Sequence, residues 1–496
     1  MKITRYIVVG LLAIVGFGSC SESFLDTEYT AELDAQAASE AAGNNPDVFL
    51  NGMWSWMVTF NMAGTGAHDD FGIMSILHST DMMGQDIALS AGHWFRFDYQ
   101  HDNRMYNYRR TSVDWLCLYT LVAKANEVIS LYPNGGETAA QKSLLGQAKA
   151  IRGMAYYYLI QLYQFPVDAN GAVNNTAKGV PLIYTTADGK TEEEITASKG
   201  RNTLGAVYEQ IEKDLTAAVE NLAGYERPNK NYIDVNVANG LLARYYLLSQ
   251  QWQKAAEAAN KARDGYAIMG KTGLHDGFMD ISNEEWMWGF DHTTETTTTY
   301  ASFFSHISAL APGYGGLGYS TRLIDKKLYE SIASDDYRKS LFNGAEGNAK
   351  NPTVGSRKPY ANLKFGTDGT WTMDYMYMRA AEMVLIEAEA YAHLNQGAKA
   401  AEVLKILMAN RQPSWDMSTV TVEDVYLQRR IELWGEGFSY FDLKRLNKGI
   451  DRNYEGNNHL AGYKLTVPAQ EKNWVYQIPL REMQENKLIT EKDQNE

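Results

Sequence analysis

Apolar side chains recur every three to four residues over three long stretches of the chain, the spacing that places them on one face of an α-helix. These stretches cover about residues 111–164, 204–264 and 375–447. Turn-forming residues divide each stretch into shorter helices, as the run PNGG at residues 133–136 does in the first. A shorter helical pattern covers residues 47–59. The pattern therefore predicts a mostly α-helical protein.

Two of the predicted helix pairs share a spacing of aromatic and small residues. Tyr246 precedes Ala255 by nine residues, and Tyr391 precedes Ala400 by the same interval. Small side chains let two antiparallel helices approach closely while an aromatic ring fills the groove between them, as in tetratricopeptide (TPR) repeats. Residues 148–156 resemble the first helix of a third pair. We expect a TPR-like scaffold, with plain helical hairpins as the alternative.

Two regions, residues 61–110 and 265–374, lack a helical pattern but are rich in aromatic residues, which argues against disorder. Long irregular segments of this kind are usually functional. Within the second region Trp286 and Trp288 alternate with other residues, which predicts a short strand with one buried face.

The pattern divides the main part of the chain into three predicted regions. Residues 46–264 form an N-terminal helical region that carries the irregular insert 61–110. Residues 265–374 form an irregular region expected to bind a ligand, and residues 375–496 form a helical region that completes the scaffold.

The first residues have the order of a secretory signal peptide. Lys2 and Arg5 precede the apolar stretch 7–17, which is too short to span a bilayer. Small residues follow it and lead to Cys20, so we expect residues 1–19 to be a signal peptide.

The sequence FGSC at residues 17–20 resembles a bacterial lipobox, in which cleavage leaves the cysteine as a lipid-carrying N-terminus. Several acyl chains on Cys20 would hold the protein firmly at a membrane. We therefore expect residues 20–45 to be a lipidated tether and the protein to lie on the cell surface.

Composition and charge limit the classes of molecule that the protein is expected to bind. The chain has 45% apolar and 21% charged residues and a net charge of −14, with no long basic block, so nucleic acid is not an expected partner. Besides Cys20 the only cysteine is Cys117, in an apolar helical stretch, where we expect a small buried side chain.

No local signature of an enzyme, a phosphate-binding loop or a dinucleotide site is present, and we predict neither catalysis nor a cofactor. The side chains of His68, Asp69 and Asp70, or those of Asp81 and Asp86, could bind a metal ion, or they could be solvated or helix-capping polar groups. The second reading is favoured, so no metal site is predicted. Paired carboxylates for glycoside hydrolysis carry no sequence mark.

The sequence supports a ligand-binding site better than it supports a catalytic or metal site. A flat aromatic ring stacks on the C–H face of a sugar, while polar side chains bond its hydroxyl groups, and such sites are usually preformed. Residues 93–99 read HWFRFDY, a dense aromatic and polar cluster. A second aromatic group comprises Tyr300, Phe303, Phe304, Tyr314 and Tyr319. The alternative for both groups is that the rings pack loops onto the scaffold, and this is favoured for Phe303 and Phe304.

Several segments together resemble the SusD/RagB family of outer-membrane nutrient-binding lipoproteins. They are CSESFLD at 20–26, QAKAIRGMAYYY at 147–158, EAEA at 387–390, RRIELWGEGFSYFDLKR at 429–445 and IPLRE at 478–482. The fourth is the most specific. The resemblance implies a scaffold of about four TPR-like helix pairs, a less regular half that carries the ligand site, and a SusC-type TonB-dependent transporter as partner.

Ligand residues do not carry over from the family, because binding loops vary. We expect Trp94 to be the stacking ring, with Phe95 beside it and His93, Asp81 and Asp86 as nearby polar groups. Tyr300, Tyr314 and Tyr319 are second-rank candidates. The charged residues of 429–445, namely Arg429, Arg430, Glu432, Glu436 and Asp442, are expected to pair within the protein.

Three functions remain open from the sequence. The first is capture of a glycan at the outer membrane and its delivery to the transporter. The second keeps the architecture but binds peptides, and the third, least favoured, is a surface glycosidase.

Overall fold

The computed structural model describes residue 45 and residues 47–496. The predicted signal peptide, Cys20 and nearly all of the predicted tether lie outside the described residues.

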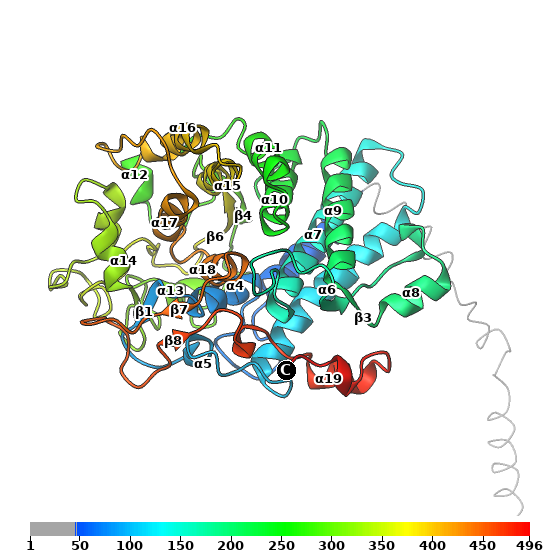
Figure 1. The fold of residues 1–496 in the computed structure, drawn as a ribbon, viewed down its shortest axis with the longest axis horizontal. Helices are drawn as coiled ribbons and strands as arrows, with labels where there is room; N and C mark the ends of the chain where they lie inside the picture. The colour runs from blue at the N-terminus through cyan, green and yellow to red at the C-terminus, as the bar shows by residue number, and fades with distance from the viewer. Residues whose placement is uncertain (1–44, 46) are drawn as a thin grey trace, which may run out of the picture.

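Eight helices form the scaffold and follow one another along an arc, from α6 at one end to α16 and α17 at the other (Figure 1). Neighbours in this arc pack in the order α6, α7, α9, α10, α11, α15 and α16, and α17 packs on α15. Their bounds are α6 Arg109–Leu131, α7 Ala139–Tyr163, α9 Leu204–Asn221, α10 Val235–Leu248, α11 Trp252–Ala262, α15 Ala380–His393, α16 Gly397–Met408 and α17 Val422–Glu432. The mostly helical, TPR-like scaffold is confirmed.

Several of these helices begin where the sequence predicts them, because side chains cap their N-terminal ends. Thr138 and Gln141 form a reciprocal capping box at the start of α7, and Asp234 accepts the N–H of Val237 at the start of α10 (2.9 Å). Such caps use backbone N–H groups that otherwise lack partners at a helix start.

Small residues set the close spacing of the scaffold helices. All five alanines of α11 are buried, and this helix packs against both α10 and α15. On α7, a methyl group added at Gly153 would meet the Leu215 side chain of α9 at 2.9 Å. The alanine spacing that predicted TPR-like packing therefore corresponds to real helix interfaces.

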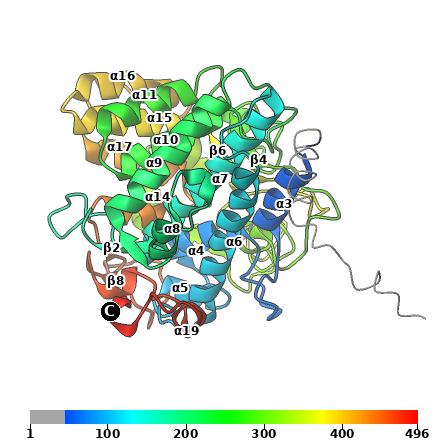
Figure 2. The same cartoon turned by 90° about the vertical axis from the view of Figure 1, so that its right-hand side faces the viewer.

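The other elements are mostly short; α4, α13 and α14 lie among loops below α15 and α17 in Figure 1, and α4 and α5 lie below α9 and α10 in Figure 2. The other α-helices are α3 Asp47–Val58, α4 Ile73–Met82, α5 Arg96–Tyr99, α8 Glu192–Ser198, α12 Lys271–Leu274, α13 Phe303–Ile307, α14 Lys326–Ser331, α18 Ser439–Arg445 and α19 Leu480–Glu485. The 3₁₀ turns are η2 Thr186–Asp188, η3 Tyr337–Leu341, η4 Lys472–Trp474 and η5 Glu491–Asp493. Among the described helices, none is both long and apolar enough to cross a bilayer.

The strands pair in four small antiparallel ribbons. The pairs are β1 Ile87–Leu89 with β5 Arg322–Ile324, β2 Lys178–Pro181 with β3 Arg201–Thr203, β4 Trp286–Phe290 with β6 Tyr375–Arg379, and β7 Ile450–Asp451 with β8 Thr466–Val467. The strand predicted around Trp286 and Trp288 is confirmed, although both of its faces are buried.

Two helical predictions need correction. Residues 375–379 belong to β6, not to a helix, because they pair with β4 beneath the scaffold. Helix α4 lies in the region predicted to be irregular. All ten of its residues are buried, including His78 and Asp81, so no polar face marks it in the sequence.

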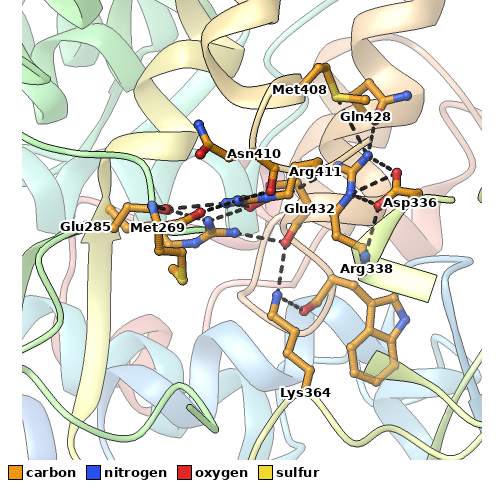
Figure 3. Close-up of polar contacts among 12 residues, drawn as sticks. Met269, Glu285, Asp336, Arg338, Lys364, Met408, Asn410, Arg411, Gln428 and Glu432 are labelled. Carbon is orange, nitrogen blue, oxygen red and sulfur yellow. Dashed lines mark hydrogen bonds and ion pairs between the residues drawn. The ribbon is translucent and has the colours of Figure 1, made fainter. Parts of the chain in front are cut away.

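A buried ion network joins α17 to the irregular half (Figure 3). The carboxylate of Glu432, at the end of α17, forms ion pairs with the guanidinium groups of Arg379 (2.7 Å), Arg411 (2.8 Å) and Arg338 (3.1 Å). Burial by itself raises the pKa of Glu432, but the three guanidinium groups hold this pKa well below its usual range. Arg379 also binds Glu285 next to β4 (2.6 Å). The expected internal pairing of the 429–445 segment is thus confirmed for its central carboxylate.

The rest of that segment behaves the same way. Arg429 pairs with Asp442 (3.0 Å), and Glu436 binds Arg379 (2.8 Å). The segment is not one helix, however, because Gly435 and Gly437 adopt left-handed backbone conformations between α17 and α18.

Candidate functional site

The pairing of β1 with β5 brings the two aromatic loops together. Leu89 lies opposite Arg322, and the N–H of Ser90 donates to the carbonyl of Thr321 (3.0 Å). Because the strands are antiparallel, the loop that leaves β1 and the loop that enters β5 emerge at the same end. The first loop carries residues 90–95 and the second carries residues 312–321.

The first loop is anchored by Phe95, whose side chain is 2% exposed. Its ring packs against the rings of His78 (centroids 4.7 Å apart) and His306 (5.1 Å). Phe95 has a φ of 67° at the start of α5, a conformation that non-glycine residues rarely adopt. The buried ring and the turn leave His93 and Trp94, the two preceding side chains, half-buried at the surface.

The second loop lies close against α13. A methyl group added at Gly316 would come within 2.0 Å of the carbonyl oxygen of Ala311, so only glycine fits there. The N–H of Gly315 donates to the carbonyl of Ser305 in α13 (2.9 Å). These contacts fix the position of Tyr314, the residue before Gly315, whose own N–H donates to Oγ of Ser305 (3.3 Å).

Tyr314 is the centre of a group of rings that we call the ring cluster, formed by His68, His93, Trp94, Tyr300, Tyr314 and Tyr319. The centroid of the Tyr314 ring lies 4.8 Å from His93, 5.8 Å from Tyr300, 5.9 Å from His68, 6.3 Å from Tyr319 and 6.4 Å from Trp94. From beneath, the buried His306 stacks on Tyr314 at 4.9 Å.

The ring cluster is open to solvent. Tyr319 is 59% exposed and Tyr300 is 45% exposed, while His68, Trp94 and Tyr314 are half-buried. Rings that only closed loops onto the scaffold would be covered, as Phe303 and Phe304 are. The structure therefore brings together five of the predicted candidates, His93, Trp94, Tyr300, Tyr314 and Tyr319, on one surface.

Comparison with known proteins gives two family matches. Residues 319–496 match the model of the SusD family, and residues 62–247 match a model described as "Starch-binding associating with outer membrane". The chain belongs to the SusD/RagB family. SusD-like protein P2 of Formosa agariphila is 24% identical over 388 residues, which covers 68% of this chain and 72% of that protein.

Solved structures of SusD-like proteins share the fold. A SusD-like carbohydrate-binding protein from Bacteroides vulgatus superposes with a TM-score of 0.77 and 26% identity, covering 92% of this chain and 98% of the other. Surface glycan-binding protein A from Bacteroides thetaiotaomicron, solved with laminarihexaose, has a TM-score of 0.64 at 14% identity, covering 90% and 98%. The second likeness concerns the fold alone.

Three candidates of this SusD-family chain do not reach the ring cluster. Phe95 points into the core. Asp81 is 2% exposed and accepts the backbone N–H groups of Gly437 (2.7 Å) and Ser439 (3.2 Å). Asp86 is 3% exposed and pairs with Arg430 (2.6 Å).

The expectation that Asp81 and Asp86 are polar groups of the ligand site is therefore corrected. Both carboxylates lie next to a tightly folded turn, where Asp81 accepts hydrogen bonds from N–H groups and Asp86 pairs with a cation inside the protein, so they are not available to a ligand. Both carboxylates hold the family segment 429–445 against α4 and β1.

His68 belongs to the ring cluster, although the sequence indicated it only as a possible metal ligand. Its Nδ1 lies 2.6 Å from the phenol oxygen of Tyr314, and its ring is parallel to that of Tyr300 with centroids 6.0 Å apart. In the sequence His68 stands in a polar loop far from either tyrosine, so no local signal identifies it. Across residues 47–496, no group of three or more His, Cys, Asp or Glu side chains is placed to hold a metal ion.

Two histidines of the site, His93 and His306, have lowered pKa values. Burial lowers the pKa of His93, and the cations Arg322 and Arg96 lower it further. Burial also lowers the pKa of His306 well below its usual range. The lowered pKa of His93 favours its uncharged form near pH 7, and an uncharged ring suits the C–H face of a sugar.

A pocket of about 440 Å³ adjoins the ring cluster. His93 and Trp94 line it, whereas Tyr300, Tyr314 and Tyr319 do not. Its other walls come from α5 and the start of α6, and include Arg96, Tyr108 and Arg109.

Proposed function

We propose that this protein captures a glycan at the outer membrane and passes it to a SusC-type TonB-dependent transporter. The observation that carries the proposal is the exposed ring cluster, in which Trp94 and Tyr319 flank Tyr314. Aromatic rings spaced over a preformed surface can stack on successive sugar units, and preformed sites bind with a small ordering cost.

Polar atoms at the ring edges complete the chemistry. The Nδ1 of His93 and the Nε1 of Trp94 have no hydrogen-bond partner among the described residues. A bound sugar offers hydroxyl groups at its ring edges, which suit such atoms. The SusD-like and glycan-binding relatives lend support, since carbohydrate binding is what their names state.

The proposed location rests on the sequence. The signal-peptide pattern, the FGSC sequence at residues 17–20 and the outer-membrane association in the description of the matched family support a lipid anchor on Cys20. Replacing Cys20 with alanine should move the protein from the membrane fraction to the soluble fraction of cells. Membrane retention of this variant would contradict the anchor.

Catalysis is not part of the proposal. The carboxylates that line the adjoining pocket, Asp69 and Asp98, both pair with the buried Arg110 (3.0 and 3.1 Å). Glycoside hydrolysis needs carboxyl groups that are free to act on the substrate, whereas both of these carboxylates are bound to an arginine. We therefore assign the site to binding.

The experiment is a binding panel of purified polysaccharides, measured by retardation in affinity gels and by calorimetry. Trp94→Ala should weaken binding of the retained polysaccharide by at least about ten-fold. Trp415→Ala is the matched control, because Trp415 is also half-buried but lies between α16 and α17. Equal affinity of the Trp94 variant and the wild type, or co-purified peptides in place of a polysaccharide, would overturn the proposal.

A further inference from the structure

The pocket beside Trp94 contains an arginine that has no acidic partner. Among the described residues, Arg96 makes no ion pair and no side-chain hydrogen bond, and its guanidinium lies 4.5 Å from the centroid of the exposed Phe97 ring. In a protein with a net charge of −14, an arginine at a pocket rim without a carboxylate is available to a ligand.

A second arginine of the pocket has an unused donor. Arg109 binds Asp69 through Nη2, but its Nη1 is buried and has no hydrogen-bond partner among the residues that the structure covers. A buried donor without a partner is unfavourable, so an acceptor that reaches it is bound more tightly. The pocket walls thus include three arginines, Arg96, Arg109 and Arg110, against two aspartates, Asp69 and Asp98.

A further cation lies behind the pocket wall. Arg322 is fully buried, and its guanidinium carbon is 5.8 Å from the centroid of Phe95, which lines the pocket. It donates to Nε2 of His78 (3.2 Å) and to the carbonyl (2.7 Å) and hydroxyl (2.9 Å) oxygens of Ser320, and to no carboxylate among the described residues. Burial lowers the pKa of Arg322 to about 9, so the group remains a cation at neutral pH.

A buried cation without a paired carboxylate is costly, and it raises the positive potential of the nearby surface. Arg322 and Arg96 both act on His93, which lies between the ring cluster and the pocket. The positive field therefore extends over the point where the two parts of the site meet.

We propose that this pocket is a subsite for a sugar unit that carries an anionic group, either a carboxylate or a sulfate ester. Arg96 and the Nη1 of Arg109 donate to the anion, while Trp94 and Tyr108 form apolar walls for the sugar ring. Arginine suits this task because its donors match the oxygens of a carboxylate or sulfate. The inference rests on the proposed glycan binding and names the chemical class of the glycan.

The test compares polysaccharides that share a backbone and differ in charge. The carboxylate arm uses polygalacturonate and its fully methyl-esterified form, and the sulfate arm uses dextran sulfate and dextran, with laminarin as a neutral glucan. We expect the charged member of one pair to bind at least about ten-fold more tightly than its neutral partner, and this preference to shrink with added salt. The arm that responds identifies the anionic group.

Variants separate the subsite from the ring cluster. Arg96→Ala should lower affinity for the charged polysaccharide by about ten-fold, and Arg96→Lys should retain part of it. Arg481→Ala is the matched control, because the Arg481 side chain on α19 is 82% exposed and, within residues 47–496, its ion pair is with Glu485. It removes the same charge without touching the pocket.

The outcomes distinguish the two proposals. Equal affinity for the charged and neutral members of both pairs, with binding lost in Trp94→Ala but unchanged in Arg96→Ala, would overturn the anionic subsite and leave glycan binding standing. Failure of every polysaccharide to bind would overturn both. A loss in Arg481→Ala equal to that in Arg96→Ala would also overturn the subsite, because the effect would then follow net charge alone.

Discussion

The phenol oxygen of Tyr314 lies 2.6 Å from Nδ1 of His68, and this contact joins residues that are 246 positions apart in the chain. The loop before α4 and the loop before β5 therefore meet at one hydrogen bond in the middle of the ring cluster. His306 reinforces the junction, because its Nε2 lies 2.7 Å from the carbonyl oxygen of His68 while its ring stacks on Tyr314.

Removing the phenol oxygen should loosen the ring cluster without removing a ring. Tyr314→Phe loses one hydrogen bond, worth about 1 kcal/mol, and should lower glycan affinity about five-fold in calorimetry. Tyr314→Ala, which removes the central ring, should lower affinity further. Tyr454→Phe serves as the control, since it removes a hydroxyl that binds Asp325 (2.6 Å) outside the ring cluster. Equal losses in Tyr314→Phe and Tyr454→Phe would contradict this role.

Neutralising Glu432 should destabilise the whole protein. Glu432→Gln leaves Arg338, Arg379 and Arg411 buried with one carboxylate fewer, and breaking a buried ion pair typically costs about 3–5 kcal/mol. Urea unfolding should show this loss. Glu423→Gln, which affects the exposed pair with Lys448, should cost less than about 1 kcal/mol. A Glu432 variant as stable as the Glu423 variant would show that the network does not hold the two halves together.

Gly437 is required for two separate reasons, and paired variants can separate them. Its φ is 93°, and an added methyl group would lie 2.6 Å from Cβ of Leu77. At Gly224 the φ is 74° but no atom lies within 4 Å. Both substitutions to alanine should incur backbone strain of about 1 kcal/mol, and only Gly437→Ala should add an overpacking cost of about 1–3 kcal/mol. Similar unfolding free energies for the two variants would rule out the close approach to Leu77.

Asp114 should make stability depend on pH. Burial raises its pKa from 3.8 to about 7, and neither carboxylate oxygen has a hydrogen-bond partner among the described residues. Between these two pH values the unfolded state releases the proton while the folded state keeps it, so stability falls as pH rises. Asp114→Asn cannot titrate. Relative to the wild type, it should gain up to about 4 kcal/mol of unfolding free energy between about pH 4 and pH 8.

Thermal or urea unfolding of both proteins across this range measures the difference. Other titrating groups contribute equally to the two proteins and cancel. Parallel stability curves for the wild type and the Asn variant would contradict a neutral Asp114 in the folded protein.

The scaffold could be predicted because its signals are local. The three-to-four-residue apolar spacing located α6, α7, α9, α10, α11, α15 and α16. The apolar spacing did not identify helix α4, because this helix is buried on all sides and has no separate apolar face. The candidates Asp81 and Asp86 show the same limit, since the sequence marks a carboxylate as polar but does not reveal whether its partner is solvent, a ligand or a buried arginine.

The sequence by itself determined which rings are available and where the helices lie, because side-chain chemistry and helical periodicity act over a few residues. Only the tertiary structure decided that Trp94, Tyr314 and His68 share one surface and that Phe95 faces inward. That decision depends on the antiparallel pairing of β1 with β5, two strands more than two hundred residues apart. A short strand has no local feature that names its partner, because strand pairing is set by the packing of the whole chain.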